Sequence, residues 1–224
     1  MNAGPASTAP HGAAPARTRL LAAGDAAAAA RLAHEAFGGD PFYERVMGFD
    51  ARAFVVFWDE FFRLALRDAR CRVFGIEASD ELLAVLVVTL HGFPAAAHAA
   101  GYLRRLLARL GPRRVLRYLR FVRGYERAMR RPPAEEEREA RCYWLFVSPT
   151  APMRGLGARL LRAAGVVLHR SGIPVATGFI DAGNERLLRF YRRLGISIGP
   201  AFPFLGATAA RIEMPTVRFV EPRP

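Results

Sequence analysis

Residues 147–158, with the sequence VSPTAPMRGLGA, decide the fold because they join a strand to a helix through a turn. The apolar run Cys142–Val147 predicts the strand, and the spacing of apolar residues predicts the helix over 157–171. Gly155 and Gly157 allow the backbone to approach a ligand closely. The free N–H groups of the first helical turn, together with the helix dipole, form a site for phosphate. A tight turn that binds no ligand is the alternative interpretation.

A second motif follows the next expected strand, Val175–Ile180. Residues 184–194, with the sequence NERLLRFYRRL, predict a helix that stops at Gly195. Asn184 and Tyr191 are two helical turns apart and therefore lie on one face, roughly 10 Å from each other. Taken singly, Asn184 is most simply a helix cap and Tyr191 a core aromatic. Together the two motifs indicate a strand, helix, strand, helix unit with adjacent parallel strands.

The upstream half predicts a sheet covered by helices. Residues 1–17 are mostly Ala, Pro, Gly, Ser and Thr, which predicts a disordered tail before a single domain over 18–224. The elements expected next are a strand over 18–21, a helix to Phe37 capped by Asp25, an aromatic helix over 51–69 capped by Asp50, and a hairpin of strands 72–77 and 82–90. Two extended segments, near 202–205 and 211–220, are expected to close the chain.

The composition excludes several classes of protein. A chain of 224 residues with 52% apolar residues can bury a core without disulfides, which excludes wholesale disorder and a disulfide scaffold. The two cysteines, Cys71 and Cys142, are expected to be structural and suit a reducing compartment. No apolar run approaches the ~20 residues of a membrane span, and the N-terminus does not resemble a signal peptide. We therefore expect a cytoplasmic protein with no membrane span.

The charge is concentrated in one segment. The chain has 33 basic and 20 acidic residues, a net charge of +13, and every basic residue of the 33 is arginine. Residues 104–131 contain eleven arginines and one acid, within an expected helical insertion over 95–131. A solvated helix face is the simplest interpretation. Binding of an acidic surface, either nucleic acid or a membrane, or the lining of an acceptor site or partner interface, stays open.

The two motifs, taken in order, resemble those of the GCN5-related N-acetyltransferase (GNAT) superfamily. The residues that carry the resemblance are Val147-Ser-Pro149, Arg154-Gly155-Leu-Gly157, and Asn184 with Phe190-Tyr191 and Gly195-Ile196. The order of the upstream elements is similar to the branch that contains puromycin N-acetyltransferase. The resemblance implies an α/β fold: a mixed, mostly antiparallel sheet with helices on both faces, splayed between the two parallel strands. Pro152 departs from the Gln or Arg of the family and removes one backbone N–H donor.

The resemblance also implies roles for particular residues, with acetyl-CoA as acyl donor and no metal. Backbone groups of Phe146 and Val147 would pair with the pantetheine arm, Asn184 would hold it, and Tyr191 would protonate the departing thiolate. The amides that would cradle the pyrophosphate belong to Arg154, Gly155, Leu156, Gly157, Ala158 and Arg159. The nearest guanidinium partners for the phosphates of CoA would be Arg154, Arg159 and Arg193.

The predicted activity is transfer of an acetyl group from acetyl-CoA to a primary amine of a small molecule or peptide by direct attack. An inactive acyl-CoA-binding protein and an arginine-rich nucleic-acid-binding protein on the same fold are the alternatives, and a homodimer stays open. Glu77, His91 and the cluster 135–139 are candidates for the general base, and none of them is favoured by the sequence.

Overall fold

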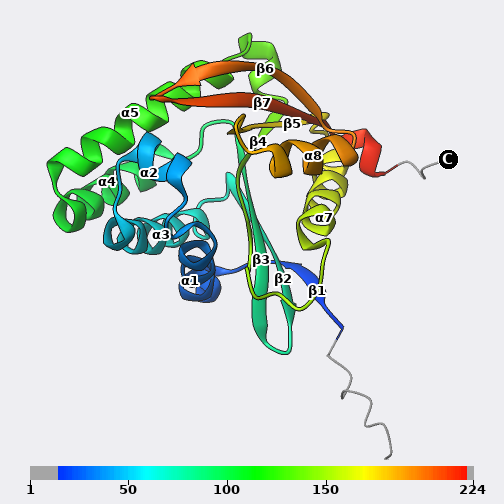
Figure 1. Cartoon of the computed structure of the whole chain (residues 1–224), viewed down its shortest axis with the longest axis horizontal. Coiled ribbons are helices and arrows are strands. Elements are labelled where there is room, and N and C mark those ends of the chain that lie inside the picture. Colours follow the sequence, from blue (N-terminus) through cyan, green and yellow to red (C-terminus); the bar gives the residue numbers. More distant parts are fainter. Residues whose placement is uncertain (1–14, 221–224) are drawn as a thin grey trace, which may run out of the picture.

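The computed structural model describes residues 15–220, which form a seven-stranded sheet of order β1-β2-β3-β4-β5-β7-β6 (Figure 1). The strands are β1 (Arg17–Leu20), β2 (Cys71–Ala78), β3 (Glu81–Leu90), β4 (Glu139–Val147), β5 (Val175–Asp181), β6 (Ser197–Phe204) and β7 (Ala207–Pro215). Neighbouring strands are antiparallel except for β4 and β5, which are parallel. The predicted mixed, mostly antiparallel sheet is therefore confirmed.

Helices cover both faces of the sheet, as predicted (Figure 1). They are α1 (Ala26–Phe37), α2 (Pro41–Met47), α3 (Ala51–Ala65), α4 (Ala96–Leu110), α5 (Pro112–Met129), α6 (Pro133–Glu136), α7 (Leu156–Arg170) and α8 (Glu185–Arg193), with two 3-10 turns at Ala23–Asp25 and Thr216–Phe219. The core has two layers: one packs α1 to α5 on one face of the sheet, and the other packs α7 and α8 on the opposite face.

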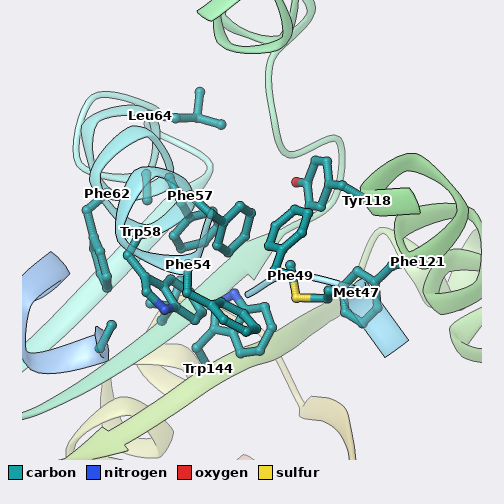
Figure 2. Packing of buried hydrophobic residues seen from close by; sticks show 14 of the residues in the cluster. Met47, Phe49, Phe54, Phe57, Trp58, Phe62, Leu64, Tyr118, Phe121 and Trp144 are labelled. Atoms are coloured by element: carbon teal, nitrogen blue, oxygen red, sulfur yellow. The ribbon is translucent and has the colours of Figure 1, made fainter. Parts of the chain in front are cut away.

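The layer under α1 to α5 is built largely from aromatic rings (Figure 2). Trp58 of α3 is fully buried and lies 4.9 Å, centroid to centroid, from the ring of Trp144 on β4, edge to face. Phe54 and Phe57 of the same helix are also buried. Edge-to-face and offset contacts of this kind add to the burial of large rings. These ring contacts therefore fix α3 against β4, next to the point where the candidate site begins.

Several boundaries differ from those predicted. Arg17 belongs to β1 and not to the predicted tail, while residues 1–14 of that tail lie outside the described residues. Asp50 caps α3, since its carboxylate accepts from the Ala53 N–H at 2.8 Å, but α3 ends at Ala65 and not at 69. Asp25 occupies the N-cap position of α1, as predicted, but its carboxylate accepts from the Arg19 guanidinium and the Ala22 N–H and from no amide of α1. The two last extended segments form one hairpin, β6 and β7, followed by a 3-10 turn.

The expected insertion is the helical pair α4 and α5, whose two helices meet at Gly111. The helix α5 buries one side in the aromatic layer through Val115, Tyr118, Phe121, Tyr125 and Met129. Its arginines lie on the remaining surface. Of the eleven arginines over 104–131, those with a carboxylate within 4 Å among the described residues are Arg105, Arg109, Arg114 and Arg131. The solvated and partly paired helix face is therefore the interpretation that the structure supports.

Candidate active site

The strands β4 and β5 pair over only three residues before they part. Glu139–Arg141 pair with Val175–Thr177, after which β4 continues beside β3 alone. At the parting point a Cβ on Gly178 would lie 2.7 Å from the Cys142 carbonyl oxygen, so only glycine allows the two strands to approach this closely. The predicted splay between the two parallel strands is confirmed, and it leaves the β5-facing edge of β4 without a strand partner among the described residues.

The exposed edge of β4 carries backbone groups of alternate residues. The Ser148 N–H donates to the Leu83 carbonyl of β3 at 2.8 Å, and alternation along the strand then turns the backbone groups of Phe146 toward β3 as well. Those of Leu145 and Val147 face the open edge. The backbone N–H and C=O of Val147 are therefore free of partners among residues 15–220, as predicted. Those of Phe146 point toward β3, so the second residue with free backbone groups is Leu145 and not Phe146.

A bulge interrupts β4 beside the parting point. Val87 and Val88 of β3 stand opposite Trp144 and Cys142, so Tyr143 has no partner in the register. A bulge bends its strand and re-aims side chains. Tyr143 and Trp144 consequently both pack on the face covered by α1 to α5.

The loop from β4 to α7 presents a row of unpaired amides. No acceptor among residues 15–220 is bonded to the N–H groups of Met153, Arg154, Gly155, Leu156, Gly157 or Ala158. Gly155 adopts φ +80°, and a Cβ there would meet no atom within 4 Å, so the space beside the amides is open. The amide of Arg159 differs from the prediction, because it donates to the Gly155 carbonyl at 3.0 Å within the helix. Free amides at the start of a 15-residue helix suit a phosphate group.

Gly157 has a different role from Gly155. A Cβ on Gly157 would lie 3.3 Å from Cζ of Phe190 on α8 and 3.5 Å from Cδ2 of Leu145 on β4. Position 157 therefore requires a residue without a side chain, because α7, α8 and β4 pack together at this point. The two sequence motifs meet in space here, as their pairing in the sequence predicts.

The three predicted guanidinium partners have different surroundings. The side chains of Arg154 and Arg193 are exposed and have no carboxylate within 4 Å in the described part of the chain. The Arg159 guanidinium donates to the Ala16 carbonyl at 2.7 Å, so it holds the segment before β1. Arg154 stands directly beside the open amides and is the cation best placed for an anion bound there.

The helix α8 positions the two remaining predicted residues. Asn184 is its N-cap, and the side-chain Oδ1 accepts from the Leu187 N–H at 3.0 Å, which leaves the Nδ2 donors for another partner. Tyr191 is buried, and burial raises the pKa of its hydroxyl, with Cys142 of β4 raising it further. The hydroxyl is therefore protonated at neutral pH, and Tyr191 packs in the same buried layer as Cys142 and Leu145 of β4. Asn184 is thus a helix cap and Tyr191 a buried aromatic residue, as the simpler interpretations predict. The Nδ2 of Asn184 and the hydroxyl of Tyr191 are still available as hydrogen-bond donors.

The two cysteines are not candidates for a nucleophile. Burial raises the pKa of the Cys142 thiol to about 12 and also raises the pKa of Cys71. A reactive cysteine needs the opposite shift, because the thiolate is the nucleophile. Among residues 15–220 no group of three or more His, Cys, Asp or Glu side chains is arranged to hold a metal ion. In the same residues no helix is both long and apolar enough to span a bilayer.

The opposite side of the splay is filled by rings. Phe121 of α5 lies 6.2 Å from Trp144 of β4 and 6.2 Å from Phe179 of β5, so its ring bridges the two diverging strands. Tyr125 of α5 lies 5.1 Å from Phe179, and Tyr43 of α2 lies 4.9 Å from Trp144. The face of the splay that α2 and α5 cover is therefore closed by aromatic packing.

Candidate bases from the sequence separate into two groups. His91, Glu136 and Glu139 line one cavity together with Tyr143. Glu77 does not: its carboxylate accepts from the Arg19 guanidinium at 2.7 Å, at the β1 edge of the sheet. Residues that the sequence did not single out are Leu145, Gly178 and Phe121, whose positions depend on strand register and on the placement of α5.

Comparison with known proteins identifies the fold. No protein-family model matches the chain, and a search of curated proteins finds no match either. Solved structures do match: an N-acetyltransferase of Staphylococcus aureus Mu50 is 13% identical with a TM-score of 0.57, over 91% of this chain and 99% of that one. A GNAT-family structure from Desulfovibrio desulfuricans is 14% identical with a TM-score of 0.55, over 90% and 99%. The PaiA N-acetyltransferase of Thermoplasma acidophilum, solved with coenzyme A, is 12% identical with a TM-score of 0.54, over 90% and 99%.

These matches define the class of fold: it is the α/β fold of GNAT acetyltransferases. At such low identity they show the fold alone. The branch that includes puromycin N-acetyltransferase stays a prediction, as do the roles of the site residues.

Proposed function

We propose that the protein is an acetyl-CoA-dependent N-acetyltransferase whose acceptor is a primary amine. The observation that carries the proposal is the free edge of β4, which runs directly into a loop with six unpaired amides. An extended pantetheine arm and a pyrophosphate need these two features in this order. A solved neighbour of the same fold contains coenzyme A, which supports the choice of ligand.

The residues of the chain divide the binding among them. Leu145 and Val147 offer backbone groups to the amides of the arm, and the Asn184 side chain offers its free donors. The amides from Met153 to Ala158 receive the pyrophosphate, with the Arg154 guanidinium as a flexible second partner. Pro152 takes one amide away from the loop, but six remain.

The chemistry requires no covalent intermediate on the enzyme. The nitrogen of a neutral amine attacks the thioester carbonyl carbon, the new C–N bond forms, and the C–S bond breaks. The nitrogen gives its extra proton to solvent water, the departing thiolate gains one from the Tyr191 hydroxyl, which its raised pKa keeps protonated, and solvent water then reprotonates Tyr191. The chain's task is to bind and orient the donor and to supply that proton.

The experiment measures acetyl-CoA binding by titration calorimetry and thiol release in the presence of a panel of primary amines. Wild type should bind acetyl-CoA and release thiol with at least one amine. In Gly155→Val the side chain occupies the open space beside the amides and strains φ, so the Kd should rise at least about 100-fold.

Gly172→Val is the matched control for this test. Gly172 also has a positive φ, +75°, and also has no atom within 4 Å of its Cβ position, but it follows the far end of α7. The strain should be the same, whereas acetyl-CoA affinity should not change. Equal affinity of Gly155→Val and wild type would refute the amide loop, and binding without thiol release would identify an acyl-CoA-binding protein instead.

A further inference from the structure

The cavity beside the parting point of β4 and β5 has a volume of about 220 Å³. Its walls come from the end of β3 and the loop 91–93 after it, the first half of β4, α5 and α6. The side chains that matter are His91, Glu126, Glu136, Glu139, Arg141 and Tyr143. Glu139 and Arg141 are the first and last residues of β4 paired with β5, and Tyr143 is the bulged residue.

This position places the cavity next to the expected thioester. The free edge of β4 leads from Val147 back to Tyr143, four residues or roughly 13 Å at about 3.3 Å per residue. A chain laid along that edge from the amide loop therefore ends beside the parting point. The other approach to the same point is filled by Phe121, Tyr125 and Phe179. Tyr143 contacts the Tyr125 ring at 4.8 Å and also lines the cavity, so the cavity is the space left for an acceptor on this face.

The charge of the cavity is opposite to that of the chain. The chain has a net charge of +13, yet the cavity is lined by three glutamates and one arginine. Arg141 forms an ion pair with Glu126 and lies 3.8 Å from Glu136. Glu139 is buried, accepts from the Thr177 hydroxyl and pairs with Arg131 at 3.0 Å. Glu139 also lies 3.6 Å from the Arg211 guanidinium, so three guanidiniums, those of Arg131, Arg141 and Arg211, hold the three carboxylates, but Arg141 alone of these lines the cavity.

Two carboxylate oxygens in this network have no partner. Glu126 contacts Arg141 through Oε2, and Glu136 contacts the Arg131 N–H and Arg141 through Oε1. Among the described residues, no donor is bonded to Oε1 of Glu126 or Oε2 of Glu136. Each oxygen is an available acceptor on a carboxylate whose other oxygen is paired, which suits the N–H groups of an ammonium.

We propose that this cavity is the acceptor site and takes a small, positively charged amine, whose ammonium donates to Glu126 and Glu136, gives one proton to solvent water and then attacks as the neutral amine. The proposal rests on the function proposed above. The volume is below the roughly 300–1,000 Å³ of pockets for drug-sized ligands, which favours a short alkylamine or the end of a longer one. In the lining itself, three carboxylates and one guanidinium favour a cation over a neutral alcohol of equal shape.

The test uses 1,4-diaminobutane as the amine and 1,4-butanediol as its neutral counterpart. We expect 1,4-diaminobutane to bind wild type, by calorimetry without acetyl-CoA, and 1,4-butanediol not to compete. Glu126→Gln combined with Glu136→Gln should weaken diamine binding, and raise the KM for the amine, at least about tenfold. Acetyl-CoA affinity should be unchanged.

Glu135→Gln is the matched control. Glu135 is the neighbour of Glu136 and pairs with Arg131 at 3.1 Å, but it does not line the cavity. Unchanged diamine affinity in the double variant, or an equal loss in Glu135→Gln, would overturn the proposal. If the double variant does not fold, competition by the diol on wild type would overturn it. Absence of acetyl-CoA binding would count against the proposed function only, since diamine binding is measured separately.

Discussion

The two sides of the splay between β4 and β5 are built from different parts of the chain. On the side of α7 and α8, the edge of β4 and the loop to α7 present backbone amides, glycines and open space. On the side of α2 and α5, the rings of Phe121, Tyr125 and Tyr43 fill the space against Trp144 and Phe179. We refer to these as the amide side and the ring side, and the ring side includes α3, whose Trp58 packs against Trp144.

The difference separates stability from binding. The buried rings of the ring side contribute mainly to the free energy of folding, because they remove large apolar areas from water and fill a close-packed interior. Unpaired amides on the amide side contribute nothing to folding and are satisfied only by solvent or a ligand. Substitutions on the two sides should therefore have separable effects: on unfolding free energy in one case, and on ligand binding or turnover in the other.

The largest effect should come from Trp58 on the ring side. Trp58→Ala removes a fully buried ring that contacts both Trp144 and Phe146, and should lower the free energy of unfolding by about 3–5 kcal/mol. Urea unfolding measures this loss. Val55→Ala is the control, because Val55 lies on the same helix but is 47% exposed. A loss below about 1 kcal/mol for Trp58→Ala would show that the ring side does not hold the fold together.

Tyr191 tests the amide side. Tyr191→Phe keeps the buried ring and removes the proposed proton donor, so turnover should fall about 100-fold while acetyl-CoA affinity is retained. Tyr125→Phe is the control from the ring side: its hydroxyl is buried without a hydrogen-bond partner among the described residues, and its loss should not lower turnover. Thiol-release kinetics and calorimetry give the two readouts. Undiminished turnover in Tyr191→Phe would remove this residue from the mechanism.

Glu60 tests how the ring side holds the arginine-rich helices. Its carboxylate is buried and accepts from Arg105 at 2.6 Å and Arg109 at 2.8 Å. Burial alone would raise the pKa of Glu60, but the hydrogen bonds from these guanidiniums outweigh burial and lower it. Glu60→Gln should cost about 1–3 kcal/mol at pH 7, with acetyl-CoA affinity unchanged.

The pH dependence of this cost follows from the lowered pKa. A carboxyl with a lowered pKa stabilises the fold above its unfolded pKa, about 4.3, and loses that contribution as the pH falls through its folded pKa. The difference between wild type and Glu60→Gln should thus be complete at pH 6 to 7 and shrink below about pH 4. Urea unfolding at pH 7 and pH 3 measures it, and an equal difference at both values would contradict the ion-pair origin.

Local patterns predicted most of the fold. The turn at 147–158 and the helix at 184–194 gave the parallel strand pair, and Asp50 marked the start of α3 correctly. The end of α3 was missed: the helix stops at Ala65, and shortly after it the Asp68 carboxylate accepts from the Ala95 N–H at 2.7 Å, a contact distant in sequence. Helix propensity alone carries no information on such a contact.

The site was predictable only in part, for a similar reason. The free amides near Gly155 could be predicted because the first turn of any helix has N–H groups without a partner in the helix, and Gly155 marks the start of α7. The direction of the backbone groups of Leu145 and Phe146 depends instead on the register with β3 and on the bulge at Tyr143. The cavity with Glu126 and Glu136 joins residues from α5 and α6 that only the folded chain brings to β4.

The smallest effect should come from the exposed arginines of α5, which belong to neither side. Arg120 and Arg123 are exposed and have no carboxylate within 4 Å in the described residues. Arg120→Gln with Arg123→Gln should change the free energy of unfolding by no more than about 0.5 kcal/mol, and relief of like-charge repulsion favours a slight gain. Arg109→Gln is the control, since Arg109 pairs with both Asp59 and Glu60 and its loss leaves a buried carboxylate short of a donor. Urea unfolding should therefore rank Arg109→Gln as clearly the more destabilising change, and a loss above about 1 kcal/mol in the double variant would mean that the exposed arginines support the fold.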